Sequence, residues 1–342
     1  SGESISITGT GSVTDKNVGT GKSINTTGLS LADNTSNASN YSLSAGTFTI
    51  EKKVISISGT RSYDGSTAVS SGNISLNGLI GSETLNKSGS TSISSANVST
   101  YGTGSINTAS LTLSDGSNGG LISNYTLSGG SFTLSVTSRP LTLSGSRLYN
   151  GNTTVSNSDL NTFSNIVSGE TLGLSGSGSV SSANTGNSKT VTLGTLALQN
   201  GSGSASNYSI SSASLSVNPV AVSLSGSRTY DGSSLASASD LTISGLIGSE
   251  TLVLSGAGTI TSSAVANNYD VSQGSLSLGD GSNGGLAANY TLNGSTRTLN
   301  ITPRILNISG TRIYDGTTNA VSSDLTLSNL VGSETLALSG TG

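Results

Sequence analysis

Short runs of alternating apolar and polar residues dominate the chain. Val220, Val222 and Leu224 are separated by single small residues, and Leu252 and Leu254 show the same spacing. A period of two over about four to eight residues is typical of strands with one buried face. No helical period is present, and Asp-Gly and Asn-Gly pairs separate the runs as turn signals. The pattern therefore predicts an all-β protein of short strands.

A motif, Arg-x-Tyr-Asp-Gly, recurs along the chain with its tyrosines 86, 81 and 84 residues apart. Two further markers keep about the same spacing: a glutamate before an apolar run, and an Asn-Tyr pair. The motif comprises Arg61, Tyr63, Asp64 and Gly65; Arg147, Tyr149, Asn150 and Gly151; Arg228, Tyr230, Asp231 and Gly232; and Arg312, Tyr314, Asp315 and Gly316. The other markers are Glu83, Glu170, Glu250 and Glu334, and Tyr41, Tyr125, Tyr208 and Tyr290 of the Asn-Tyr pairs. Such a period predicts a tandem array.

These markers divide the chain into five segments. We expect complete repeats at residues 53–138, 139–218 and 219–302, the C-terminal part of a repeat at 1–52, and the N-terminal part of one at 303–342. Since the sequence starts and stops inside a repeat, we expect the natural chain to continue at both ends.

Each repeat has room for six to eight short strands, which predicts a small Ig-like antiparallel β-sandwich. A β-solenoid is the alternative, but each marker occurs once per repeat and no shorter submotif is visible. Pro140, Pro219 and Pro303 lie at the seams between repeats, where almost no linker is present. Short, proline-stiffened seams favour an elongated rod of sandwiches.

Two repeat types alternate along the chain. Residues 78–85 recur letter for letter at 245–252, which makes the repeats at 53–138 and 219–302 type A and those at 139–218 and 303–342 type B. Duplication of a two-repeat unit explains the alternation. A lateral contact made by alternate repeats is the other explanation. It predicts that type A features gather on one side, namely Tyr101, Tyr269 and the loops at 115–120 and 280–285.

The composition excludes several functional classes. The chain lacks His, Cys, Met and Trp, and only 9% of its residues are charged. The usual general base, thiol nucleophile and soft metal ligands are therefore missing, and we expect no enzyme activity, no cofactor and no metal site. A net charge of −4 does not favour nucleic acid as a partner. No apolar run approaches the length that spans a bilayer, so we expect no membrane insertion in this segment.

The Arg-x-Tyr-Asp-Gly motif, the following Gly-Ser-Glu-Thr-Leu and the terminal Asn-Tyr-x-Leu resemble the YDG/MBG-type repeats of large bacterial surface adhesins and haemagglutinin-like exoproteins. The resemblance covers essentially the whole chain. It implies export to the cell surface or extracellular matrix of a Gram-negative bacterium, with a role in adhesion, biofilm matrix or extracellular filaments. Asn150 departs from the motif, and a turn tolerates that exchange better than a carboxylate site would.

The markers also have candidate chemical roles. We interpret the Tyr-Asp-Gly segment as a β-turn whose tyrosine packs its ring and bonds to the backbone, with a saccharide or cation site as the alternative. One arginine and one glutamate per repeat predict an ion pair between two strands. The Asp115–Gly120 loop offers a single carboxylate, which is poor for calcium.

The sequence therefore predicts a structural stalk or fibre segment of a secreted surface protein. The expected partners are neighbouring repeats of the same chain, other copies in a fibre, or matrix polysaccharide. The alternative is a multivalent module that binds carbohydrate or a host surface.

Overall fold

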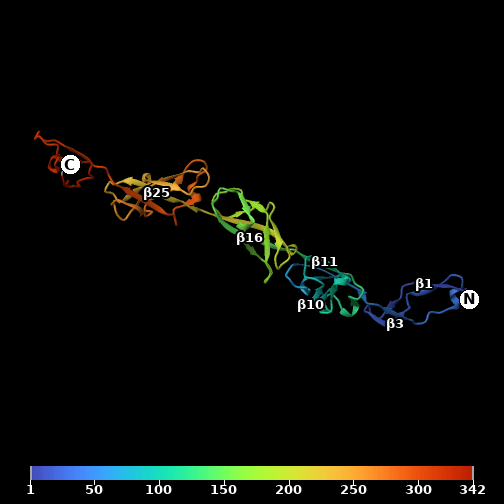
Figure 1. Cartoon of the computed structure of the whole chain (residues 1–342). Coiled ribbons are helices and arrows are strands. Elements are labelled where there is room, and N and C mark those ends of the chain that lie inside the picture. Colours follow the sequence, from blue (N-terminus) through green and yellow to red (C-terminus); the bar gives the residue numbers. More distant parts are fainter. Residues whose placement is uncertain (1, 341–342) are drawn as a thin grey trace. The chain divides into compact units, whose positions relative to one another are not determined.

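The computed structural model describes residues 2–340, and their regular structure consists of β-strands and short 3-10 turns. The predicted all-β array of small sandwich-type domains is confirmed. Figure 1 traces the chain from β1 and β3 near its N-terminal end through β10, β11, β16 and β25. None of the described residues forms a helix that is long and apolar enough to cross a membrane.

The repeat at residues 53–138 contains two four-stranded sheets and the short strand pair β6-β14. One has the strand order β11-β15-β7-β9, and in the other β10 pairs with β8, β12 and β13. Most pairs are antiparallel, while β7 and β15, and also β6 and β14, run parallel. The elements are β6 (Lys53–Val54), β7 (Ser56–Ser62), β8 (Ala68–Ser70), η2 (Ser71–Asn73), β9 (Ile74–Asn77), β10 (Leu85–Ile93), β11 (Ser99–Gly102), η3 (Thr103–Ser105), β12 (Ile106–Asn107), β13 (Leu111–Asp115), η4 (Ile122–Asn124), β14 (Tyr125–Thr126) and β15 (Phe132–Thr137).

The core of this repeat follows the alternation in the sequence. Ile57 of β7 and Leu134 of β15 are buried, whereas Thr133 beside Leu134 is exposed. Gly59 continues β7 where the carbonyl of Asn73 in η2 approaches so closely that a Cβ would not fit. A glycine in this strand therefore allows the 3-10 turn to pack against the sheet.

The repeats at 139–218 and 219–302 contain the first of these sheets, ordered β18-β16-β23-β21 and β27-β25-β33-β30. In place of the second sheet they contain strand pairs, β17-β20 and β19-β22 in the first repeat and β26-β29 and β28-β31 in the second. The first contains β16 (Arg139–Leu148), β17 (Thr154–Ser156), η5 (Asn157–Asp159), β18 (Thr162–Ser164), β19 (Leu172–Ser175), β20 (Ser177–Ser179), β21 (Gly186–Thr190), β22 (Ala197–Asn200), η6 (Ala205–Asn207) and β23 (Tyr208–Asn218). The second contains β24 (Val220–Ala221), β25 (Ser223–Thr229), β26 (Leu235–Ser237), η7 (Ala238–Asp240), β27 (Leu241–Ser244), β28 (Leu252–Ser255), β29 (Ala257–Thr259), β30 (Ala266–Asp270), β31 (Ser277–Asp280), η8 (Ala287–Asn289), β32 (Tyr290–Thr291) and β33 (Arg297–Thr302).

The two outer segments contain partial sheets. Residues before Lys53 form the pair β1-β4 and the sheet β2-β3-β5, and those after Thr302 form the pair β34-β35. The elements are β1 (Ile5–Gly9), β2 (Ser12–Val13), β3 (Gly19–Asn25), β4 (Leu29–Asp33), η1 (Ala38–Asn40), β5 (Thr47–Ile50), β34 (Asn307–Gly310), η9 (Ser322–Asp324) and β35 (Leu325–Ser328).

The contacts along the chain define two compact units. The first extends to Leu141 and includes Asn165–Gly173 and Leu198–Ser211. The second includes Thr142–Ser164 and Leu174–Ala197 and continues from Ser212. Every contact between neighbouring repeats that is described below lies within one of these units.

Candidate functional site

The Arg-x-Tyr-Asp-Gly motif folds into a turn that its own side chains close. Asp64 Oδ1 accepts a hydrogen bond from the amide of Ser66 at 2.9 Å, and the Arg61 guanidinium donates to Asp64 and to the Ser66 carbonyl. Asn150 accepts from the amide of Asn152 at 3.0 Å in the same way. An amide oxygen serves as well as a carboxylate in this bond, which explains the Asp-to-Asn exchange.

The expected ion pair between the arginine and glutamate of one repeat is wrong. Arg147 pairs with Asp159 at 3.1 Å, and Arg228 lies 3.5 Å from both Asp231 and Asp240. In the complete repeats the arginine is the next-to-last residue of the strand before the turn. Its guanidinium therefore reaches carbonyls of the turn and of the strand that follows it, and the aspartate of the adjacent 3-10 turn in the case of Arg147 and Arg228. The glutamates have a different partner.

Glu170 binds two tyrosines that come from neighbouring repeats. Tyr63 of the preceding repeat donates its hydroxyl to Glu170 Oε1, and Tyr208 of the same repeat donates to Oε2, both at 2.5 Å. The two rings meet edge to face, with centroids 5.4 Å apart and planes at 77°. The amide of Val167 donates to the Tyr208 hydroxyl at 3.2 Å. The Tyr-Asp-Gly tyrosine thus bonds to the next repeat and not, as expected, to the backbone.

The same junction recurs one repeat later. Tyr149 and Tyr290 donate to the two carboxylate oxygens of Glu250, each at 2.6 Å, and their rings lie 5.6 Å apart at 76°. Tyr230 donates to Glu334 of the following segment. We use the word socket for the glutamate together with the Asn-Tyr tyrosine of the same repeat. The motif tyrosine of the preceding repeat fills this socket.

An asparagine adds a second contact between neighbouring repeats at three places. Asn207 is buried, and its Oδ1 accepts from the amide of Val98 at 2.9 Å while its Nδ2 donates to Asn97 Oδ1 at 2.9 Å. Because the asparagine satisfies a backbone amide of the preceding repeat, its loss would leave a buried donor without a partner. The equivalent bonds join Asn124 to Val18 and Asn17, and Asn289 to Thr185 and Asn184.

Burial and the neighbouring carboxylates keep the junction tyrosines protonated. Burial, followed by the hydrogen bond to Glu170, raises the pKa of Tyr208 to about 12. Burial and Glu250 raise the pKa of Tyr149 to about 12 in the same way. Phenols with a raised pKa remain hydrogen-bond donors to the carboxylate throughout the neutral range. This arrangement can hold two repeats together.

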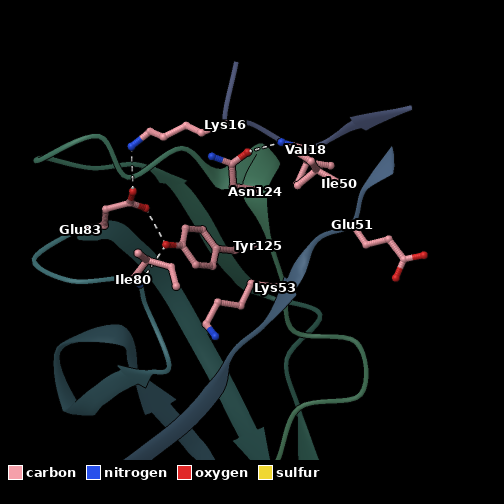
Figure 2. Close-up of a pocket in the computed structure, with 9 residues that line it drawn as sticks. All are labelled: Lys16, Val18, Ile50, Glu51, Lys53, Ile80, Glu83, Asn124 and Tyr125. Carbon is pink, nitrogen blue, oxygen red and sulfur yellow. Dashed lines mark hydrogen bonds and ion pairs between the residues drawn. The ribbon is translucent and has the colours of Figure 1, made fainter. Parts of the chain in front are cut away.

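In the socket of Glu83 and Tyr125, a lysine takes the place of the second tyrosine (Figure 2). Tyr125 donates to Glu83 Oε2 at 2.5 Å and accepts from the amide of Ile80 at 3.1 Å, as Tyr208 does at Glu170 and Val167. At Oε1, Lys16 Nζ lies 3.6 Å away, where a tyrosine hydroxyl lies in the sockets of Glu170 and Glu250. These side chains border a hollow of about 290 Å³.

The difference between the two repeat types lies partly at the junctions. Tyr101 of a type A repeat is buried, and its hydroxyl donates to the Asn97 carbonyl at 2.6 Å. Lys189 occupies the equivalent position in a type B repeat and donates to the carbonyls of Ser182 and Asn184. Both side chains bind the carbonyl of an asparagine, Asn97 or Asn184, whose own side chain contacts the next repeat. Since Tyr101 points into its own repeat, it does not form the lateral surface that the contact explanation requires.

The aspartates of the type A loops bind backbone amides. Asp115 Oδ1 accepts from Ile122 at 2.8 Å, and Asp280 Oδ1 accepts from Ala287 at 2.7 Å. Among residues 2–340 no three His, Cys, Asp or Glu side chains gather in a group that could hold a metal ion. The loops are therefore accounted for by turn formation.

The structure divides the predicted site residues into two groups. The arginines and the aspartates close turns, while Tyr63, Tyr149 and Tyr230 of the motif donate to glutamates at the junctions. Tyr314 of the motif is 92% exposed. Asn97, Asn124, Asn207 and Asn289 were not identified as site residues. The recurrence of asparagine before each marker tyrosine was a signal that could have identified three of them.

A comparison with family models gives a match to the YDG domain at residues 1–49, 134–216 and 213–299. No curated protein and no solved structure matches the chain. Because the matched residues make up more than half of the sequence, the chain belongs to the YDG domain family.

Proposed function

We propose that this chain is a structural stalk or fibre segment of a secreted bacterial surface adhesin or extracellular filament. Its repeats provide reach, and adhesion or matrix scaffolding, and carry out no catalysis. The observation that supports the proposal best is the carboxylate of Glu170, which accepts hydrogen bonds from tyrosines of two neighbouring repeats. A junction of this kind transmits the orientation of one repeat to the next.

The energetics of such a segment are additive. Each complete repeat has its own core, and each junction adds a fixed set of contacts, so stability is roughly a sum of repeat and interface terms. The junction bonds are to a charged group and are partly shielded from water, which makes each of them worth about 1.5–3 kcal/mol. Because only 9% of the residues are charged, the ionic strength of the solution should change the stability of the segment little.

Distance measurements between repeats test this proposal. The chain has no cysteine, so Thr142→Cys and Thr242→Cys, both at exposed positions of neighbouring repeats within the second unit, accept a pair of spin labels. The labelled chain should give a narrow distance distribution by pulsed electron paramagnetic resonance. Adding Glu250→Gln should broaden it. A distribution that is equally broad in both chains would contradict the proposal.

The proposed location has its own test. Antibodies raised against this chain should label intact bacterial cells or the matrix around them. Labelling that appears only after the cells are made permeable would argue against export.

A multivalent carbohydrate-binding module is the second candidate. The observation in its favour is a shallow polar hollow of about 520 Å³ lined by Ser58, Thr60, Asn73, Ser75 and Thr133 among others. Its lining has no aromatic ring on which a sugar could stack. Binding of the whole chain on an array of glycans and matrix polysaccharides would favour this candidate.

A further inference from the structure

We infer that each complete type A repeat resists tension along the chain through one strand pair, formed by the first long strand of the repeat and its last strand. In the repeat at 53–138 these strands are β7 and β15, and in the repeat at 219–302 they are β25 and β33. We call each pair a clamp. The inference goes beyond the proposed function, which requires length and fixed junctions but no resistance to pulling.

The two strands of a clamp run parallel and in step. Ile57 pairs with Phe132 near the start of β7 and β15, and Ser62 pairs with Thr137 at their end. The pairs between them follow one another without a shift, which gives six consecutive pairs. The clamp of the other repeat has the same register, and its end pairs are Leu224–Arg297 and Thr229–Thr302.

The parallel direction places the entry and the exit of the chain at opposite ends of the clamp. The chain enters before Ile57 and leaves after Thr137, and the pairs between them extend over about 17–20 Å at the usual rise of a strand. Tension therefore pulls β7 toward its start and β15 toward its end, along the strand axis. In an antiparallel pair, entry and exit would lie at the same end and the hydrogen bonds would break one after another. In a clamp they must all give way together.

Further hydrogen bonds close the clamp at its exit end. The amide of Tyr63, the residue after β7, donates to the Thr137 carbonyl at 2.9 Å, and the Thr137 hydroxyl donates to the Arg61 carbonyl at 3.2 Å. The last residue of the closing strand is thus bound through its backbone and its side chain. The equivalent bonds of the other repeat join Tyr230 to Thr302 at 2.8 Å and Thr302 to Arg228 at 3.2 Å.

A second parallel pair lies at the entry end. β6 pairs with β14 in the repeat at 53–138, and β24 pairs with β32 in the repeat at 219–302. The amide of Ile55, between β6 and β7, donates to the Thr126 carbonyl of β14 at 2.9 Å. The opening segment 53–62 is therefore paired with the closing segment 125–137 from one end to the other.

The core of the repeat shields one face of the clamp. Ile57, Leu134 and Val136 are buried there, as are Leu224, Leu299 and Ile301 in the other repeat. A buried donor or acceptor that loses its partner cannot turn to water at once, so burial raises the barrier for separating the strands. Forced unfolding depends on that barrier.

Tension reaches the clamps without a slack linker. β15 ends at Thr137 and β16 of the next repeat begins at Arg139, so a single residue separates them. One residue also separates β23, which ends at Asn218, from β24, which begins at Val220. A pull on one repeat is therefore passed directly from its closing strand to the opening strand of the next.

The direction of pulling tests the inference, because a clamp is strong along its strands and weak across them. The chain has no cysteine, so pairs of introduced cysteines can attach the handles of an optical trap. Lys52→Cys with Pro140→Cys pulls β7 and β15 along the strands, and Lys52→Cys with Ser123→Cys pulls the entering chain sideways from β14. All three positions are exposed. We expect a rupture force severalfold higher with the first pair than with the second.

The extension after rupture identifies the repeat, since the first pair releases about 300 Å of extended chain and the second about 240 Å. Urea unfolding checks that both chains have the same stability, so that only the direction of pulling differs. Pro219→Cys with Pro303→Cys, or with Ala288→Cys, repeats the comparison for the other clamp. Equal forces in the two directions, or a higher force across the strands, would overturn the inference and leave the junctions of the proposed function untouched.

A matched pair of substitutions gives a second test. Val136→Ala removes buried methyl groups from the clamp, and Val69→Ala removes the same groups from β8 in the other sheet. Both valines are at most 3% exposed, so the two variants should lose similar amounts of stability. With handles at Lys52→Cys and Pro140→Cys, Val136→Ala should lower the rupture force and Val69→Ala should leave it unchanged. The inference fails if both variants lower the force equally, or if only Val69→Ala lowers it.

Discussion

At the scale of single residues, the junction depends on one carboxylate shared by two phenols. Glu170 uses both of its oxygens, and each accepts from a tyrosine of a different repeat. A glutamine at this position would keep one acceptor and present an amide group to the second hydroxyl. In a chain with few charged residues, these glutamates therefore serve mainly to connect repeats.

We predict that Glu170→Gln lowers the free energy of unfolding by about 1.5–3 kcal/mol, the usual contribution of hydrogen bonds to a charged group. Urea unfolding followed by circular dichroism would measure it. Glu83→Gln is the matched control, because that socket holds one tyrosine and Lys16. Its effect should be smaller, and an equal effect would show that the second tyrosine contributes nothing.

The raised pKa values predict that the protein loses stability in alkali. A tyrosine whose folded pKa is about 12, above its ordinary value of about 10, stabilises the fold fully below pH 10. That contribution disappears as the pH rises from about 10 to about 12. Urea midpoints measured across this range should fall, and the fall should be smaller in Tyr149→Phe and Tyr208→Phe chains. An undiminished fall in both variants would assign the effect to other groups.

At the scale of elements, the turns that follow Tyr63, Tyr149 and Tyr230 meet the next repeat as well. Gly65 has a φ of +78°, and a Cβ there would lie 3.1 Å from Val167 Cγ1. Gly129, in the same repeat, has a φ of +80° and no neighbour within 4 Å of that position. The two glycines thus share a backbone conformation and differ in their surroundings.

We predict that Gly65→Ala destabilises the protein more than Gly129→Ala does. Both variants place a side chain in the left-handed region, which costs about 1–3 kcal/mol. Only the first also forces Val167 to move. Thermal unfolding of the two variants side by side would measure the difference, and equal melting temperatures would mean that the junction adjusts without cost.

At the scale of the whole molecule, the fold rests on sheets, small cores and junctions. No disulfide is present in a chain without cysteine. The aspartates most suited to calcium, Asp115 and Asp280, bind backbone amides. Stability must therefore come from the apolar faces of many short strands and from contacts between neighbouring repeats.

We predict that removal of divalent cations leaves the unfolding transition unchanged. Melting curves in EDTA and in millimolar calcium should coincide, because the described residues contain no group of acids that could serve as a calcium site. A large difference between the two curves would show that cations bind through backbone carbonyls or between copies.

The sequence by itself determined the fold class, the repeats and the turns. These features depend on local chemistry: alternation predicts strands, and Asp or Asn before Gly predicts a turn whose side chain bonds to its own backbone, as Asp64 does. They can be recognised in one segment without knowing what that segment contacts.

Only the tertiary structure decided which markers meet. Tyr63 and Glu170 are 107 residues apart, and they belong to different repeats. The period shows that each repeat contains one marker arginine, one marker glutamate and two marker tyrosines. The same period would result whether these side chains paired within a repeat or across a junction. The pairing depends on which strand ends face the next repeat, and packing of whole sheets sets that direction. For this reason the arginine and glutamate were wrongly paired from the sequence, while the structure places each glutamate between two tyrosines.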